Sequence, residues 1–156
     1  MKTVTVNRKP TEELVIRFIK PEDVESLMTF FTKQRDYPKT PKDANLDYDE
    51  TEIKEYIKST YDHIVVSKIG KNVTGYAVVY DLTTWGYIDE LCINKNFRGM
   101  GIGTKMFNWI ENQYKDKWYS VEMAAYEEDT EMVDYLHKLG YGKDEKLVWM
   151  FKGLKK

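Results

Sequence analysis

The sequence predicts an α+β domain in which helices cover a mixed sheet. Some segments alternate apolar and polar residues, as strands do, and others repeat apolar residues every three or four positions, as one face of a helix does. These segments follow one another as strand, two helices, three strands, helix, strand, helix and strand. An order with adjacent strands in the middle and alternating elements at the end is typical of a mixed sheet with helices packed on it.

The first half of the chain predicts one strand and two helices. Leu14–Ile19 alternates apolar and polar residues, which is the pattern of a strand. Pro21–Lys33 has apolar residues at helical spacing and begins with a proline, which fits the first turn of a helix because no N–H is needed there. The prolines and charges within Asp36–Asn45 indicate a loop. Asp49 and Glu52 have the spacing of a capping box, so a second helix is predicted to begin there.

The second half predicts five strands and two helices, one of which follows a glycine-rich turn. Gly70 and Asn72 favour a hairpin between the first two of these strands. The predicted strands are His63–Lys68, Val73–Asp81, Trp85–Ile93, Trp118–Tyr126 and Lys146–Lys152. The first helix has an apolar face formed by Met106, Phe107, Ile110 and Tyr114. Gly140 marks the expected end of the last helix, whose apolar residues are Met132, Tyr135, Leu136 and Leu139.

Composition and charge argue against several classes of protein, including nucleic-acid-binding and membrane proteins. Lys and Arg total 24 against 26 Asp and Glu, a net charge of −2, whereas a nucleic-acid-binding protein usually carries a basic excess. No apolar run approaches the roughly 20 residues that span a bilayer, and the first residues lack the apolar stretch of a secretion signal. Cys92 is the single cysteine, which excludes an internal disulfide. We expect a soluble cytoplasmic protein without nucleic-acid or membrane partners, with a short arm at 1–13 and one domain over 14–156.

Tyr87–Thr104 is the most informative segment, because a strand with two carboxylates runs into a glycine-rich turn and then a helix. Glycine lets the backbone approach a ligand closely, and N–H groups at a helix start attract anions such as a diphosphate. The turn is not a P-loop, because Thr104 follows the last glycine where that motif has Lys, and it lacks the dinucleotide-binding spacing. A plain strand-to-helix turn is the alternative. Arg98 favours the phosphate interpretation, since a guanidinium can pair with phosphate through two hydrogen bonds.

The glycine-rich turn also carries a family signature. Arg98, Gly101 and Gly103 stand at the fixed positions of the Arg/Gln-x-x-Gly-x-Gly/Ala pattern of the GCN5-related N-acetyltransferases, the GNAT superfamily. The chain resembles this family also in the LCI of Leu91–Ile93, in a closing YLHKLGY phrase and in the order of its elements, over about Leu14 to Lys152. The resemblance implies a GNAT-like acyl-CoA N-acyltransferase fold, with a mixed, mostly antiparallel sheet of six to seven strands and about four helices.

The resemblance implies acetyl-CoA as the co-substrate. No metal is expected, because His63 and His137 are isolated and lack the spacing of metal ligands. In GNAT enzymes the strand before the glycine turn separates from its neighbour, so main-chain groups of Leu91, Cys92 and Ile93 are expected to pair with the pantetheine arm. A main-chain N–H near Leu91 or Cys92 is expected to stabilise charge that develops on the thioester oxygen. The Cys92 thiol is expected to be packed rather than nucleophilic. The expected diphosphate contacts are Arg98 and the main-chain N–H groups of Gly99, Met100, Gly101, Ile102, Gly103 and Thr104.

Asp89 and Glu90 are the candidate general bases. An amine is protonated at neutral pH, and it must lose a proton before its lone pair can attack a thioester. Strand alternation predicts that the two carboxylates point to opposite faces, so that only one faces the acceptor cleft. In the polyamine acetyltransferases of the family the aligned pair is also acidic, and the resemblance implies that the first member, Asp89, is the catalytic one. The alternative is that both are solvated edge residues or ion-pair partners.

The group that protonates the leaving thiolate is less clearly marked. Many GNAT enzymes place a Tyr four residues before the glycine of the closing phrase, but that position is Leu136 here, with Tyr135 one residue earlier. Asp129 stands where the family often has Asn. Tyr135 is the candidate acid, with Tyr126 or an unassisted thiolate as alternatives, and a core or surface role for Tyr135 stays open.

Acidic residues suggest which acceptors the protein takes. Residues 122–134 contain six acids and no Lys or Arg, and a second acidic group lies within residues 43–50. By resemblance both regions flank the acceptor cleft, where negative charge would concentrate cations; solvated helix starts, where acids are favourable anyway, are the alternative. The loop aromatics Tyr37 and Tyr48 could line this cleft through cation–π contacts or lie at the surface.

We therefore expect an acetyl-CoA-dependent N-acetyltransferase. Acetyl would pass to a primary amine of a small cationic acceptor, such as a polyamine or amino sugar, by direct attack in a ternary complex. The alternatives are an acetyltransferase for protein N-termini or lysines, and a non-catalytic acyl-CoA sensor. Dimers are common in the family, so a homodimer is possible.

Overall fold

The computed structural model describes residues 12–34 and 48–143. The chain divides into two compact units, Met1–Ala124 and Ala125–Lys156, and each is described by itself. The expectation of one domain over 14–156 stays a prediction. Among the described residues, no helix combines the length and the apolar character needed to cross a membrane.

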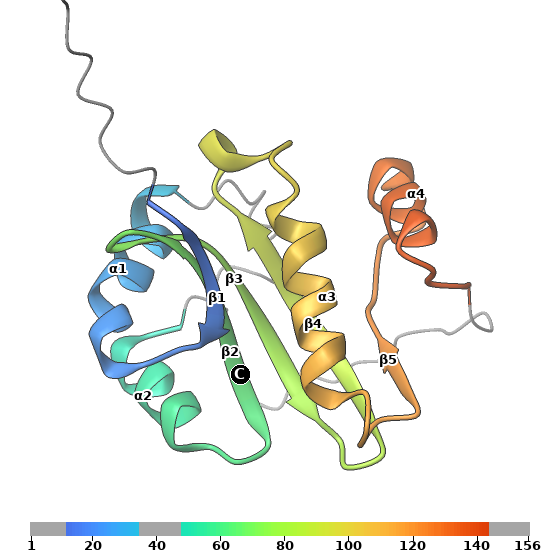
Figure 1. The fold of residues 1–156 in the computed structure, drawn as a ribbon, viewed down its shortest axis with the longest axis horizontal. Coiled ribbons are helices and arrows are strands. Elements are labelled where there is room, and N and C mark those ends of the chain that lie inside the picture. Colours follow the sequence, from blue (N-terminus) through green and yellow to red (C-terminus); the bar gives the residue numbers. More distant parts are fainter. Residues whose placement is uncertain (1–11, 35–47, 144–156) are drawn as a thin grey trace, which may run out of the picture. The chain divides into compact units, whose positions relative to one another are not determined.

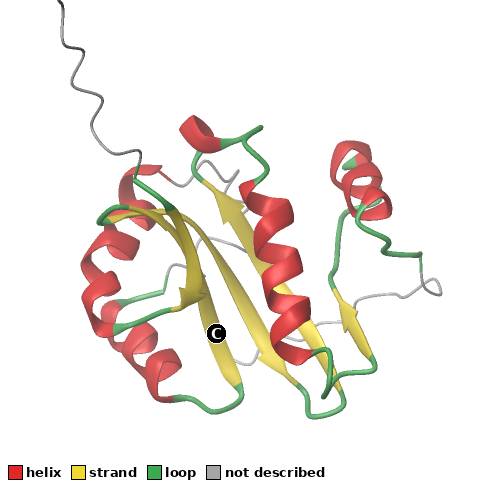
Figure 2. Cartoon of the chain, viewed as in Figure 1, coloured by secondary structure: helices red, strands yellow, loops and turns green. Residues whose placement is uncertain are grey.

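The first unit is built on a sheet of five described strands. In spatial order they are β1 (Leu14–Phe18), β2 (Asp62–Ile69), β3 (Asn72–Asp81), β4 (Trp85–Ile93) and β5 (Ser120–Glu122). Neighbouring strands are antiparallel except β4 and β5, which are parallel (Figure 2). The mixed, mostly antiparallel sheet is thus confirmed, with five described strands where six to seven were predicted. The last predicted strand, Lys146–Lys152, lies outside the described residues.

The helices follow the predicted order. The segment predicted as one helix over Pro21–Lys33 is divided into a 3-10 turn, an α-helix and a π-helical turn, and the predicted fifth strand is shorter than expected. The helical elements are η1 (Pro21–Asp23), α1 (Val24–Thr29), η2 (Phe30–Gln34), α2 (Glu50–Lys58), η4 (Lys95–Phe97), α3 (Ile102–Tyr114) and, in the second unit, α4 (Thr130–Lys138). The predicted capping box opens α2: Glu52 N donates to Asp49 Oδ1 and Asp49 N donates to Glu52 Oε2, both at 2.9 Å.

One face of the sheet packs against α1 and α2. On a strand, side chains two residues apart point to the same face of the sheet. The β2 and β3 side chains that point toward α1 and α2 form one buried cluster with apolar side chains of these helices. Its fully buried members are Leu27, Phe30, Ile53, Ile64, Val66, Tyr76 and Val78. Cys92 is 5% exposed and belongs to the same cluster, so its predicted role as a packed thiol is confirmed.

The opposite face packs against α3, which contacts β2, β3 and β4. Figure 1 shows α3 on the side of the sheet away from α1 and α2. The predicted apolar face of α3 is confirmed, since Met106, Phe107, Ile110 and Tyr114 are all buried. At the end of this helix, the Tyr114 and Trp118 rings stack with their centroids 3.8 Å apart.

Gly86 on β4 leaves room for Trp118. A Cβ added at Gly86 would lie 2.2 Å from two carbons of the Trp118 ring. The ring has little freedom to move, because it stacks on Tyr114 and its Nε1–H donates to Asp81 Oδ1 at 2.9 Å. The absence of a side chain at Gly86 is therefore required where β4 and β5 pair.

We expect Gly86→Ala to lower the free energy of unfolding by about 1–3 kcal/mol, because the added methyl group overpacks a closed site. The control is Gly142→Ala, where an added Cβ meets nothing within 4 Å. Urea unfolding followed by far-UV circular dichroism measures both. Equal midpoints for Gly86→Ala and wild type would show that Trp118 can move away.

Candidate active site

The second half of β4 has one edge that no described strand pairs. β5 pairs with β4 only at Trp85, Gly86 and Tyr87. Beyond these, Leu91–Ile93 pairs with β3 alone within the described part of the chain. Main-chain N–H and C=O groups of a strand point sideways within the sheet, so an unpaired edge can bind an extended ligand.

A glycine turn follows this open edge. Gly99 has φ +75° and Gly101 has φ +74°, a left-handed conformation that glycine adopts without steric cost. Arg98 lies just before them, and its Nε donates to Ile93 O at 3.0 Å, which fixes the guanidinium beside the end of β4. The turn thus places a cation and two glycines where the strand ends.

The turn leads directly into α3. Gly101 is the N-cap, and Lys105 N donates to Gly101 O at 3.0 Å as the first bond of the helix. In an α-helix the N–H groups before this first bond lie at its positive end and point out of the helix start. A Cβ added at Gly99 or Gly101 meets nothing within 4 Å, so both glycines face open space. This cradle fits a diphosphate.

The remaining residues of the predicted diphosphate site lie in the turn and the first turn of α3. Met100 is 59% exposed, whereas Ile102 is buried at 3% and anchors the helix start in the core. Gly103 and Thr104 are half-buried. The structure therefore brings together the strand edge that no described strand pairs, Arg98 and the glycine turn; their role in binding a cofactor stays a prediction.

A β-bulge at Asp89 determines how the two acids point. Glu90 is opposite Val78 and Ile88 is opposite the next residue of β3, Val79, so Asp89 is an extra residue in β4. A bulge breaks the alternation of side chains. The prediction that Asp89 and Glu90 point to opposite faces is wrong for this reason. Both contact tyrosines of β3 that share the α1–α2 face.

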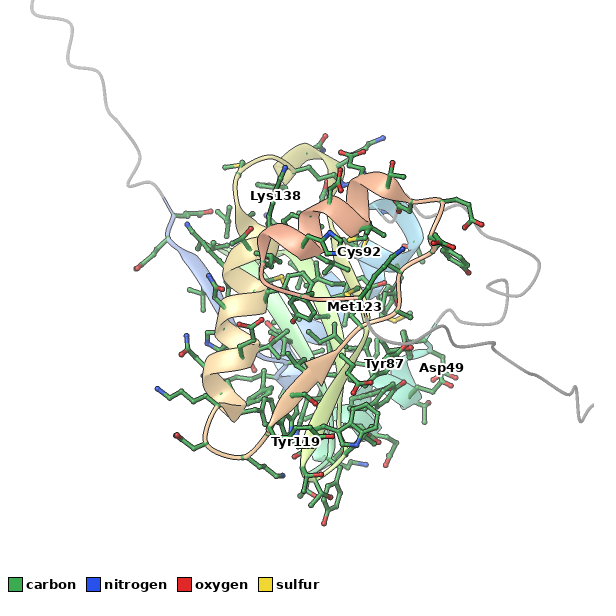
Figure 3. The ribbon with its side chains drawn as sticks, turned by 90° about the vertical axis from the view of Figure 1, so that its right-hand side faces the viewer. Asp49, Tyr87, Cys92, Tyr119, Met123 and Lys138 are labelled. Carbon is green, nitrogen blue, oxygen red and sulfur yellow. The ribbon has the colours of Figure 1, made fainter. Side chains whose placement is uncertain are left out.

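The contacts of the two acids differ. Tyr76 Oη donates to Glu90 Oε1 at 2.6 Å. Tyr80 stands on the same face of β3 as Tyr76, and its phenol lowers the pKa of Asp89 against the larger effect of burial. Tyr80 also stacks on Tyr87, with centroids 6.4 Å apart and an interplanar angle of 6°. In Figure 3, Tyr87 projects from β4 toward the side of the sheet where α2 begins.

Burial shifts the ionisation of this group of side chains. It raises the pKa of Asp89, and the neighbouring Tyr80 phenol opposes that rise. Burial also raises the pKa of Tyr56 to about 12 and raises the pKa values of Tyr48 and Tyr80. The phenols therefore stay protonated at neutral pH and can donate hydrogen bonds to the carboxylates.

A hollow of about 550 Å³ lies along α2, next to these tyrosines. Its lining is mostly acidic and aromatic, and consists of Tyr48, Glu52, Glu55, Tyr56, Lys58, Ser59 and Asp62. Tyr56 links this hollow to Tyr80 of β3, because the Tyr56 and Tyr80 hydroxyl oxygens are 3.2 Å apart. Tyr48, one of the two predicted loop aromatics, lines this hollow; Tyr37, the other, lies outside the described residues.

Sequence reasoning missed Tyr56, Tyr76 and Tyr80. Tyr76 and Tyr80 lie four residues apart on β3, a spacing that puts both on one face and opposite the acid-bearing strand. That spacing was a usable signal once the hairpin of β3 and β4 was predicted. Tyr56 had no such signal, because its contact with Tyr80 joins residues 24 positions apart.

The predicted thiolate acid lies in the second unit. Tyr135 is on α4, and Asp129 is the N-cap of that helix, with its Oδ1 accepting from Met132 N at 3.1 Å. A capping role explains an acid at this position, since short polar side chains favour it. The role of Tyr135 stays a prediction, as does that of Tyr126.

Known proteins share this fold. A TM-score of 0.68 relates the chain to an aminoglycoside acetyltransferase from an uncultured soil metagenomic sample, in complex with sisomicin (17% identity; 91% of this chain and 97% of that chain). The TM-score is 0.71 for AAC(6')-Iy in complex with the bisubstrate analog CoA-S-monomethyl-acetylneamine, at 14% sequence identity. That comparison covers 90% of this chain and 99% of that chain. The TM-score is 0.69 for a ribosomal-protein-alanine N-acetyltransferase from Brucella melitensis biovar Abortus 2308, at 14% sequence identity. That comparison covers 89% of this chain and 100% of that chain. The predicted GNAT-like fold is confirmed.

Sequence comparison places the chain in a family. No curated protein sequence matches it. The model of the acetyltransferase (GNAT) family matches residues 25–141, which is well over half of the chain and includes β4, the glycine turn and α3. The chain belongs to the GNAT family of acetyltransferases.

Proposed function

We propose that the protein transfers acetyl from acetyl-CoA to a primary amine of a small cationic acceptor, by direct attack in a ternary complex. One observation carries the proposal. A single strand, β4, has an edge that no other described strand pairs and that leads to the glycine turn, and the same strand bears the bulge that turns two carboxylates to one face. Donor and acceptor groups would therefore meet along one rigid element.

The donor site follows from main-chain groups. The edge of Leu91–Ile93 away from β3, which no described strand pairs, would pair with the pantetheine arm. Arg98 and the N–H groups of residues 99–104 would hold the diphosphate. Bound acetyl-CoA supplies an activated thioester. A main-chain N–H near Leu91 or Cys92 would stabilise charge on its oxygen. The CoA-containing analogue bound to AAC(6')-Iy, a protein of the same fold, supports this assignment.

The acid pair would remove the proton that prevents an ammonium group from reacting. Asp89 is exposed and can meet an acceptor, and the partial desolvation that raises its pKa favours the protonated form after transfer. Glu90 lies beside it on the same face. Tyr135 is the proposed acid toward the leaving thiolate, with Tyr126 as its substitute.

Acidic and aromatic side chains support a cationic acceptor. The hollow along α2 carries three carboxylates, those of Glu52, Glu55 and Asp62, against one lysine. Negative charge and aromatic faces both attract ammonium groups. One structural neighbour is an aminoglycoside acetyltransferase in complex with sisomicin, which supports the proposal of a small amine acceptor. The ribosomal-protein-alanine N-acetyltransferase among the neighbours keeps a protein N-terminus as the second candidate acceptor.

We expect Gly101→Val to weaken binding of acetyl-CoA at least about tenfold, a cost of about 1.4 kcal/mol, because the side chain would occupy the phosphate cradle. Gly140→Val is the matched control: Gly140 also has positive φ, +96°, and open space around an added Cβ, but it lies after α4. Isothermal titration calorimetry measures both variants. Wild-type affinity in Gly101→Val would rule out the assignment of the turn.

We expect the double variant Asp89→Asn, Glu90→Gln to lower kcat about 100-fold or more at pH 7, because no base takes the ammonium proton. The loss should be smaller at pH 9, where more acceptor is already deprotonated. The control, Glu13→Gln with Asp116→Asn, removes two exposed acids outside the site. Thiol release with a panel of polyamines, aminoglycosides and peptides measures turnover. Unchanged kcat at both pH values would place the base elsewhere.

A further inference from the structure

The short turn η4 joins the end of β4 to the glycine turn, and Asn94 is its N-cap. Figure 1 shows this turn between β4 and α3. Asn94 is only 4% exposed, although its side chain is a polar amide. Burial of a polar side chain is costly unless the side chain is hydrogen-bonded. The burial of Asn94 therefore points to a specific hydrogen-bonding role in this turn.

The Asn94 side chain closes the turn. Its Oδ1 accepts from Asn96 N at 3.0 Å, and its main-chain oxygen accepts from Phe97 N at 2.8 Å. A side-chain acceptor for the N–H group two residues later forms an Asx turn, which is favoured by Asn and Asp. Together the two bonds hold the chain in a tight turn immediately after β4. Asn94 thus fixes the direction in which the chain leaves the sheet.

The start of the turn is anchored in the core. Asn94 N donates to Thr74 O at 2.9 Å, which continues the ladder between β3 and β4 by one residue. Thr74 is fully buried, and its hydroxyl oxygen lies 3.1 Å from that of Ser67 on β2. Along an antiparallel strand, residues alternate between those whose main-chain groups point to the partner strand and those whose groups point away. Because Asn94 N points to β3, Ile93 O points away from β3, toward the edge of β4 that no described strand pairs.

Arg98 reaches back to this edge from the far end of the turn. Its Nε donates to Ile93 O at 3.0 Å, across five positions of sequence. The bond can form only if the intervening chain turns tightly, and Asn94 holds that chain. Arg98 is exposed, and an exposed arginine has many rotamers to lose when a ligand binds. The bond to Ile93 O selects one orientation of the guanidinium before any ligand arrives.

We propose that Asn94 is a positioning residue of the coenzyme site. By holding η4, it keeps the Arg98 guanidinium on the edge of β4, where that group meets the diphosphate, and Asn94 itself does not touch the ligand. The gain is preorganisation, since a side chain that is already oriented loses less conformational freedom on binding. This inference rests on the proposed binding of acetyl-CoA at the glycine turn.

The first test needs no ligand. Nitrogen-15 NMR of the arginine side chains measures how fast the Arg98 Nε–H exchanges with water, and Arg98→Lys identifies the signal. Exchange should be at least about fivefold faster in Asn94→Ala, because the bond to Ile93 O is no longer held. The matched control is Asn96→Ala: Asn96 is an exposed asparagine of the same turn, and it contacts Asn94 through its main-chain N–H. Exchange in this control should equal that of wild type.

The second test measures the affinity for coenzyme A by isothermal titration calorimetry. Asn94→Ala should weaken binding about tenfold, whereas Asn96→Ala should bind as wild type does. Asn94→Asp keeps a side-chain acceptor for Asn96 N, so it should restore the affinity to within about twofold of wild type. Weak binding in Asn94→Asp together with slow Arg98 exchange would contradict the inference.

A double variant tests whether Asn94 acts through Arg98. Arg98→Ala already removes the guanidinium, so adding Asn94→Ala should change the affinity for coenzyme A by less than about twofold. If the two losses multiply instead, Asn94 contributes by a route that does not involve Arg98, and the inference is overturned.

The outcomes separate this inference from the proposed function. Should Asn94→Ala fail to fold, Asn94→Ser replaces it, because a serine hydroxyl accepts the same N–H more weakly; the changes should then be smaller and in the same direction. Arg98 exchange that stays at the wild-type rate in the variant that folds would overturn the inference. If Arg98 exchange rises but the wild-type protein binds no coenzyme A, the positioning of Arg98 by Asn94 is supported and the proposed function is wrong.

Discussion

The bulge at Asp89 is the constraint on which the candidate site depends. One extra residue in β4, opposite Val78 and Val79, turns two consecutive carboxylates toward the same face of the sheet. The pairing of β4 with β5 ends at Tyr87, just before this bulge, so the rest of β4 keeps an open edge among the described strands. Strand ends and bulges are where a regular sheet can present main-chain groups and side chains to a ligand. Here the bulge and the end of the β4–β5 pairing lie on the same strand, β4.

The core and the site are physically continuous. Tyr76 packs between Phe30 and Phe31 at its ring and contacts Glu90 at its hydroxyl. The π-helical turn η2 therefore contributes to the geometry of the Glu90 carboxylate, because its residues Phe30 and Phe31 hold the Tyr76 ring. Such support is what a binding site needs, since loosely held side chains lose orientation and affinity.

Much of this architecture could be predicted from the sequence, and the exceptions have physical causes. Strand alternation, the Asp49–Glu52 capping box and the apolar face of α3 are local patterns, and the structure contains all three. The prediction that Asp89 and Glu90 point to opposite faces was wrong, because it assumed regular alternation and a bulge adds one residue without a local signal. The Tyr56–Tyr80 contact was missed because it depends on how α2 packs on the sheet. Tyr135 belongs to the second unit, so its role in the reaction remains a prediction.

The central claim is that the open edge of β4 and the turn after it bind coenzyme A. Backbone amide NMR of the labelled protein during titration with coenzyme A tests this claim most directly. The account predicts large, saturable shifts of the amides of Leu91–Ile93 and of residues 99–104, with much smaller ones around the β2–β3 hairpin. Binding of coenzyme A that shifts neither the amides of Leu91–Ile93 nor those of residues 99–104 would contradict the central claim.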